Sequence, residues 1–257
     1  MSDDLELLNF RYSHFNEKAR WALDFKQLAH ARTYLLPGPH MGKVKKLTGQ
    51  TATPVLRQGA QYIAGSAAII DALEQAHPEP PLYPAGEVER ARALEIQDWL
   101  DRDLGPYIRR ALFSMIVDEA SYMCGMFGQG QPWPQRTFYR AAYPLAKGLI
   151  RKGNGVTSQA AIDEAFDRTT EVFDRLAGMI GSSGYLVGER FGVADLTAAA
   201  LSAAAFDPPD CDMTRPRPMP QTMLDWLTRW RDHPWGEHVL RLYRDHRGAA
   251  RYAERAA

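Results

Sequence analysis

The sequence predicts two packed units, a small α/β domain at residues 1–78 and a larger all-helical bundle at residues 88–257. Three observations lead to this fold class. Strand and helix patterns alternate before residue 78, a proline-rich stretch follows at 77–87, and beyond it strand patterns nearly vanish while helical periodicity recurs. A chain of 257 residues is long enough to build a core in each unit.

The first domain is expected to run strand, helix, strand, loop, hairpin and helix. Apolar runs flank a helix-forming stretch, and a Gly- and Lys-containing loop separates them from two short strands around a glycine turn. A last helix begins at Ser66. The expected bounds are 5–10, 16–26, 31–36, 53–57, 62–64 and 66–77, in that order.

The stretch HPEPPLYPAGE at 77–87 is expected to link the two domains. Its prolines lack the N–H donor that a helix needs and clash with the preceding turn. Helical periodicity then recurs along the rest of the chain. The expected helices are 87–117, 133–152, 157–181, 193–206, 221–232 and 235–255.

Composition narrows the classes of function. The chain has 31 basic and 31 acidic residues, whereas nucleic-acid-binding proteins usually carry net positive charge, so no nucleic-acid partner is expected. The acidic start MSDDLE is unlike a secretory signal, and no apolar run reaches the roughly 20 residues that a membrane helix needs. We therefore expect a cytoplasmic protein with no membrane partner.

Neither the cysteines nor the histidines form a familiar metal motif. Cys124 and Cys211 lack CxxC spacing, so buried thiols in a reducing compartment are expected instead of a disulfide or a zinc site. His233 and His238 lie close in sequence, but their spacing fits no common zinc pattern and Pro234 lies between them. No metal is expected.

Ser13 lies in YSHFNEKARWAL, where the first strand gives way to the first helix. Phe15 can pack beneath this turn, and Arg20 follows seven residues after the serine. A helix N-terminus carries partial positive charge and unpaired N–H groups, which favour an anion. Two interpretations remain open: Ser13 caps the helix, or its hydroxyl holds a reactive group there.

With two further motifs, TATPVL at 51–56 and AGSAAII at 64–70, the chain resembles the glutathione transferase superfamily of the serine or cysteine type. The resemblance implies a thioredoxin-like first domain, an all-helical second domain and a homodimer. It also implies glutathione as co-substrate, with Ser13 in the place of the residue that contacts the glutathione sulfur. The residues Ser13-His14-Phe15-Asn16 lack both sulfurs of a redox C-x-x-C motif, so disulfide chemistry is not expected.

The two further motifs carry the remaining expected glutathione contacts. By the resemblance, Pro54 is in the cis form and the backbone of Thr53 pairs with the cysteinyl part of glutathione; a proline that merely begins an edge strand is the alternative. Ser66 and its N–H group would hold the γ-glutamyl carboxylate at a helix start. Gly65 departs from the pattern, because members of the superfamily usually have Glu or Gln there. The expected contacts with the bound molecule are Phe15, Thr53, Pro54, Gly65 and Ser66.

Charge for the glycyl carboxylate of glutathione would come from a lysine cluster, unless those side chains are merely solvated. The cluster is Lys43, Lys45 and Lys46. In the second domain, YLVGERFGVADLTAAAL at 185–201 resembles the superfamily's capped buried helix. There Asp195 would reach back to the helix start and Phe191 would act as a hydrophobic staple, with Gly192 at the cap.

Two other patterns have open interpretations. Soft and aromatic side chains gather at 113–134, and they line either an apolar acceptor pocket or an ordinary core. These are Phe113, Met115, Tyr122, Met123, Met126, Phe127 and Trp133. Arginines at 241, 244, 247, 251 and 255 recur at helical spacing, which favours a solvated face over an anionic partner or a subunit contact.

The sequence therefore favours a glutathione transferase-like enzyme that adds the glutathione thiolate to an apolar electrophile, with Ser13 stabilising the thiolate. A glutathione-dependent lyase, ether-cleaving enzyme or isomerase is an alternative on the same scaffold. A non-catalytic binding or interaction protein is the alternative from another class. If Ser13 is only a cap, Tyr12 is the next candidate for the contact with the thiol.

Overall fold

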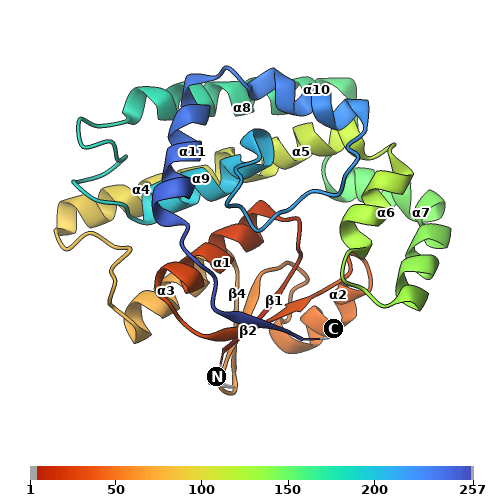
Figure 1. Ribbon diagram of the computed structural model, residues 1–257, viewed down its shortest axis with the longest axis horizontal. Coiled ribbons are helices and arrows are strands. Elements are labelled where there is room, and N and C mark those ends of the chain that lie inside the picture. Colours follow the sequence, from red (N-terminus) through yellow and green to blue (C-terminus); the bar gives the residue numbers. More distant parts are fainter. Residues whose placement is uncertain (1–4, 256–257) are drawn as a thin grey trace.

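The computed structural model describes residues 5–255, in which a mixed five-stranded sheet supports a body of helices (Figure 1). The acidic start of the chain, residues 1–4, lies outside the described residues, as do residues 256–257. The first domain holds four of the five strands and three helices. Its elements are β1 (Leu5–Asn9), α1 (His14–Phe25), β2 (His30–Tyr34), α2 (His40–Thr48), β3 (Val55–Gln58), β4 (Gln61–Ala64) and α3 (Ser66–Ala76).

The sheet order is β4-β3-β1-β2-β5, with β1 parallel to β2 and antiparallel to β3. Side chains alternate across β1, so Leu7 packs with α1 and α3 while Leu8 packs with Val44 of α2 on the other face. This arrangement confirms the thioredoxin-like first domain. The expectation of a loop at residues 40–48 is wrong, because this segment forms helix α2. Its glycine and lysines give no helical apolar pattern, since Val44 is the one buried residue that packs the helix onto the sheet.

The second domain is helical, as expected. Its helix α9 packs against α1 of the first domain. Its first predicted helix is two helices, because the chain bends at Leu104, and α6 was not predicted as a helix. The helices are α4 (Glu87–Asp103), α5 (Gly105–Ile116), α6 (Ala120–Gly128), α7 (Trp133–Gly153), α8 (Gln159–Met179), α9 (Val193–Phe206), α10 (Gln221–Trp230) and α11 (Pro234–His246).

Helix α9 lies at the centre of the second domain and is buried along nearly its whole length. Its start is fixed by Asp195, whose carboxylate accepts hydrogen bonds from the N–H groups of Gly192 (3.1 Å) and Leu186 (2.9 Å). The predicted role of Asp195 is therefore confirmed. Phe191 stacks on Trp21 of α1, which joins the cores of the two domains.

The end of the chain corrects the expected last helix. Helix α11 ends at His246, and β5 (Tyr252–Arg255) pairs in parallel with β2, in the register His30 with Tyr252 (Figure 1). The expectation of a helix to residue 255 within an all-helical second domain is wrong for this segment. Gly248, with φ +63°, follows the helix and releases the chain toward the sheet edge.

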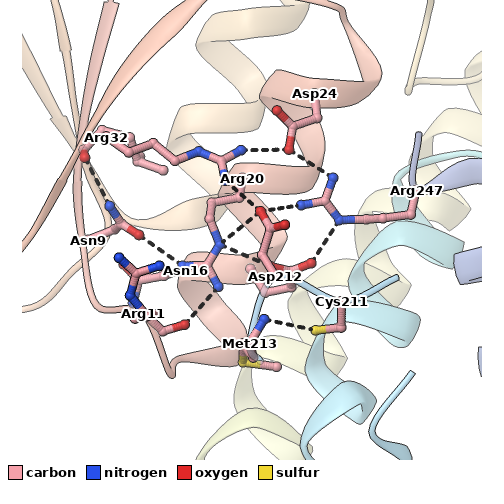
Figure 2. A network of polar contacts seen from close by, with 12 residues as sticks. Asn9, Arg11, Asn16, Arg20, Asp24, Arg32, Cys211, Asp212, Met213 and Arg247 are labelled. Atoms are coloured by element: carbon pink, nitrogen blue, oxygen red, sulfur yellow. Dashed lines mark hydrogen bonds and ion pairs between the residues drawn. The ribbon is translucent and has the colours of Figure 1, made fainter. Parts of the chain in front are cut away.

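The expected solvated arginine face is also wrong for Arg247, which is 1% exposed. Its guanidinium contacts three carboxylates, those of Glu17 (2.9 Å), Asp24 (2.8 Å) and Asp212 (2.8 Å). Figure 2 shows Arg247 facing Asp24 and Asp212 beside α1. Arg32 of β2 reaches Asp24 and Asp212 as well. The sequence pattern did not predict the burial of Arg247. Glu17 and Asp24 lie more than 200 positions away in the sequence, and Asp212 lies in a proline-rich loop.

The segment expected to be the linker has no helix or strand between α3 and α4. It is fixed to the first domain by Lys26, whose ammonium group donates to the carbonyls of His77 (2.6 Å) and Pro80 (3.1 Å). Glu74 accepts the N–H groups of Leu82 and Tyr83. Side chains at the end of α1 and in α3 therefore satisfy several backbone groups of this segment.

We predict that Arg247→Met lowers the free energy of unfolding by about 3–5 kcal/mol, because it leaves buried carboxylates without their shared cation. Chemical denaturation measures this. Arg244→Met is the matched control on the same helix, since Arg244 is exposed and contacts its neighbour Asp245. We expect a change within about 0.5 kcal/mol for that control. Equal stability of the Arg247 variant and the wild type would contradict the structural role.

Candidate functional site

Ser13 is the N-cap of α1, as one of the two interpretations required. Its backbone is extended (φ −141°, ψ 122°), and its hydroxyl oxygen accepts a hydrogen bond from the N–H of Asn16 at 3.4 Å. This long bond satisfies one of the N–H groups that a helix start leaves without an intrahelical partner. Ser13 also lines a cavity, so capping and ligand contact are compatible at this residue.

The turn that presents Ser13 is held by Arg20, the buried arginine of α1. Its guanidinium donates to the carbonyls of Phe10 (2.9 Å) and Arg11 (3.1 Å). It also pairs with Glu17 at 3.0 Å. Its contact with the side chain of Asn9, at 2.9 Å, is visible in Figure 2. The backbone just before Ser13 is therefore fixed by charge-assisted hydrogen bonds from within the same helix.

A cavity of ≈ 250 Å³ opens beside Ser13 between the two domains. The first domain contributes residues of the β1–α1 turn and Thr53, and the second contributes residues of α5 to α7, Ala204 at the end of α9, and the loop after it. Its lining is mostly apolar. The lining side chains include Phe10, Tyr12, Ser13, His14, Phe15, Thr53, Arg109, Leu112, Phe113, Met126, Phe127, Ile150, Met213 and Arg215.

Phe15 packs against the beginning of α5, as predicted for a residue beneath the turn. A Cβ at Gly105 would lie 2.3 Å from the Phe15 ring, so only glycine permits this approach. His14 donates from Nε2 to the Gly105 carbonyl at 3.0 Å. Burial lowers the pKa of His14 to about 3, and the charge of Arg109 adds to that effect, so the imidazole is neutral.

Tyr12 is turned toward the second domain. Its hydroxyl contacts the side chain of Gln129 and the carbonyl of Thr214. Burial raises the pKa of Tyr12 to about 12. The hydroxyl is therefore neutral near pH 7 and already bonded, which leaves Ser13 as the better-placed hydroxyl at the start of α1.

The peptide bond between Thr53 and Pro54 is cis, as the resemblance implied. Thr53 lies against the start of α1, because its hydroxyl oxygen accepts a hydrogen bond from the Asn16 amide at 3.2 Å. The Pro54 carbonyl accepts the N–H of Gly65 at 2.9 Å. The structure therefore brings Ser13, Thr53 and the start of α3 to the same end of the sheet.

Gly65 and Ser66 do not line the cavity but begin α3 beside Pro54. Gly65 has φ +95°, a conformation that favours glycine, so this backbone explains the departure from Glu or Gln without strain. Ser66 is buried, and its hydroxyl has no hydrogen-bond partner within the described chain. The lysines of α2, Lys43, Lys45 and Lys46, are exposed.

The predicted acceptor residues divide into two groups. Phe113, Met126 and Phe127 line the cavity. Tyr122 and Met123 belong to the core beside it, Met115 packs against that core, and Trp133 is 75% exposed. The sequence did not point to Arg109 and Arg215, because a single arginine on the inner face of a helix or in a proline-rich loop has no distinguishing pattern.

The cysteines and histidines considered in the sequence analysis lie outside the cavity. Cys124 and Cys211 are buried free thiols. His233 caps α11 by accepting the Trp235 N–H at 3.2 Å, and His238 packs on the Trp235 ring. Across residues 5–255, no three His, Cys, Asp or Glu side chains cluster as a metal site would require. Over the same range, every helix is too short or too polar to cross a bilayer.

Comparison with known proteins identifies two family matches. Residues 7–81 match the glutathione S-transferase N-terminal domain, and residues 135–214 match the glutathione S-transferase C-terminal domain. A maleylacetoacetate isomerase from Dictyostelium discoideum is 32% identical over 115 residues, which are 41% of this chain and 52% of the isomerase. The chain thus spans about half the length of this relative.

Two solved structures share the fold across nearly the whole chain. A theta class glutathione S-transferase from Xanthomonas axonopodis pv. citri, with glutathione bound, aligns with a TM-score of 0.59 at 20% identity, covering 97% of this chain and 99% of that one. A beta-etherase from Sphingobium sp. strain SYK-6 aligns with a TM-score of 0.58 at 20% identity, covering 93% and 99%. Because the two domain matches follow one another along the chain and agree with the observed sheet topology and the helical second domain, the chain belongs to the glutathione S-transferase superfamily.

Proposed function

We propose that the protein binds glutathione along the first domain and uses its thiolate to attack an apolar electrophile held in the adjoining cavity. The observation that carries this proposal is the position of Ser13, which lies at the N-terminus of α1 and lines the cavity. Thr53 beside it and Ser66 at the start of α3 are the proposed contacts with the peptide part, together with Phe15, Pro54 and Gly65.

The chemistry needs a thiolate, because a thiol is a poor nucleophile. The helix N-terminus and one hydrogen bond from Ser13 both favour the anion. If they lower the glutathione pKa from about 8.5 to about 6.5, the thiolate fraction at pH 7 rises from about 3% to about 75%. The sulfur then forms a bond to an electrophilic carbon. The thiol proton goes to solvent, and in a substitution the leaving group departs with its bonding pair.

A second candidate is a glutathione-dependent isomerase, lyase or ether-cleaving enzyme. A maleylacetoacetate isomerase and a beta-etherase are among the proteins that this chain resembles. The stoichiometry separates isomerisation from transfer, and ether cleavage by the thiolate consumes glutathione as transfer does but releases an alcohol or phenol. Transfer consumes one glutathione per turnover, whereas isomerisation by addition and elimination regenerates it. A non-catalytic binding protein would show neither.

Glutathione binding itself is tested by thermal shift. A ligand present at 100 times its dissociation constant stabilises a folded protein by about 2.7 kcal/mol. We expect the melting temperature to rise with glutathione concentration until the effect saturates. If the thiolate contributes to affinity, S-methylglutathione at low concentration should give no rise. No shift with glutathione at millimolar concentration would overturn the proposed function.

We predict that Ser66→Ala weakens glutathione binding about 10- to 150-fold, because a hydrogen bond to a charged group contributes about 1.5–3 kcal/mol. The Ser66 hydroxyl is free for this role in the described chain. Titration calorimetry measures the change. The control is Ser158→Ala, which removes the cap of α8 in the second domain and should leave the affinity unchanged. Equal affinity for the Ser66 variant and the wild type would reject the assignment.

We predict that Ser13→Ala raises the pKa of the bound glutathione thiol by about 1–2 units, since one charge-assisted hydrogen bond is lost while the helix N-terminus remains. Ultraviolet absorbance of the bound thiolate gives the titration curve. As a cap, Ser13 also contributes about 1 kcal/mol of stability, which Ser158→Ala should match. Superimposable titration curves would leave Ser13 as a cap alone and make Tyr12 the next residue to test.

The proposed enzyme is a homodimer, as its superfamily membership suggests. We predict that light scattering at micromolar concentration gives about twice the chain mass of 28.9 kDa. A first domain this small buries limited surface by itself, which favours association. A stable monomer would contradict the prediction and would favour the binding-protein alternative.

A further inference from the structure

Arg109 places a guanidinium in the candidate acceptor cavity without a counter-ion. It projects from α5, one turn after Gly105, and lines the cavity with Leu112 and Phe113 of the next turn. Its Nε is buried and has no hydrogen-bond partner. Within residues 5–255, no carboxylate lies within ion-pair distance of Arg109. A partly buried cation in this state lacks compensation for the water that it has lost.

The nearest arginine on α5 and the other arginine of the cavity each have an acidic partner, although the Nε of Arg110 is unpaired like that of Arg109. Arg110, the next residue on α5, contacts Glu164 at 3.0 Å. Arg215, which also lines the cavity, pairs with Asp207 at 2.5 Å and donates to the Ala204 carbonyl at 2.6 Å. Arg109 therefore differs from Arg110 and Arg215, because each of those has an acidic partner and Arg109 faces the mostly apolar cavity without one.

The remaining polar groups of the cavity leave the charge of Arg109 uncompensated. Burial lowers the pKa of His14 to about 3 and raises that of Tyr12 to about 12, so both side chains are neutral. Burial and the adjacent Arg110 lower the pKa of the Arg109 guanidinium from its ordinary value, which an anion beside it would reverse. Among the described residues that line the cavity, none is Asp or Glu.

We propose that Arg109 is a specificity-determining residue that selects acceptor substrates carrying a carboxylate on an apolar body. This inference rests on the proposed function, since it assigns the acceptor to that same site. A carboxylate accepts the parallel N–H donors of a guanidinium, and the apolar walls at Leu112 and Phe113 enclose the carbon skeleton.

The acceptor is a better occupant for Arg109 than glutathione is. The proposed glutathione contacts, Ser13, Thr53 and Ser66, all belong to the first domain. Arg109 belongs to the second domain, where the predicted acceptor residues Phe113 and Phe127 line the same cavity. An anion held by Arg109 would therefore contact the second domain, whereas the proposed thiolate position is at the N-terminus of α1 in the first domain.

The experiment compares binding of 3,5-dinitrobenzoate with binding of its uncharged methyl ester, by calorimetry, with and without saturating glutathione. The proteins are wild type, Arg109→Gln, Arg109→Lys and the matched control Arg110→Gln. For wild type and Arg110→Gln, we expect the acid to bind at least 10-fold more tightly than the ester. Arg109→Gln should abolish this preference and leave ester binding within about twofold. Arg109→Lys keeps the charge and should retain part of the preference.

Two results would overturn the inference. One is wild-type protein that binds the ester as tightly as the acid. The other is Arg109→Gln protein that keeps the preference for the acid, or that loses glutathione affinity while the acid still binds, because Arg109 would then serve glutathione. The wild-type comparison stands even if Arg109→Gln does not fold, and Arg109→Lys supplies the second variant.

The proposed function fails separately. If glutathione produces no binding heat with wild type, the glutathione-dependent chemistry is rejected. A preference for the acid that depends on Arg109 in the absence of glutathione would still support an anion-binding cavity. Conversely, normal glutathione binding without a preference for the acid rejects this inference and leaves the proposed function in place.

Discussion

The structure depends most on a group of buried charges gathered around α1. Three guanidinium groups and three carboxylates lie between α1, β2, the loop after α9 and the end of α11, so the group is formally neutral (Figure 2). Such charges are costly to remove from water and are tolerated only when each has a partner. Their pairing therefore fixes the relative positions of four segments. The members are Glu17, Arg20, Asp24, Arg32, Asp212 and Arg247.

This charge group also positions both sides of the cavity. Arg20 holds the carbonyls of Phe10 and Arg11, and the turn they form presents Ser13. On the other side, Asp212 is anchored by Arg32 and Arg247, and the residue after it, Met213, lines the cavity. The thiolate side and the acceptor side of the proposed site are thus held by one set of ion pairs, although they come from different domains. A residue that contacts no ligand can in this way determine the geometry of the site.

The sequence was sufficient where local chemistry decides the structure. The turn at Ser13, the proline at 54 and the acid at 195 each act on backbone within a few positions, and the structure places them as caps and turns. It was insufficient where the partner is distant. Arg247 occupies a helical spacing typical of a solvated face, yet its carboxylates come from α1 and the loop after α9, and β5 forms because β2 leaves an edge unpaired. Arg109 was missed for a different reason, because a single arginine on one face of a helix has no distinguishing pattern in the sequence.

The two domains contribute different kinds of anion-binding group to the proposed site. In the first domain, the groups proposed to hold glutathione are hydroxyls and helix N-termini, which stabilise an anion without carrying a full charge and so cost little to keep partly buried in the free protein. In the second domain, Arg109 carries a full charge within apolar walls. Its unpaired state is unfavourable until an anion arrives, so an acid gains more from entering the cavity than an ester of the same shape does. In the proposed function, supply of the nucleophile would therefore follow from the common backbone of the superfamily, whereas choice of the acceptor would follow from a side chain on α5.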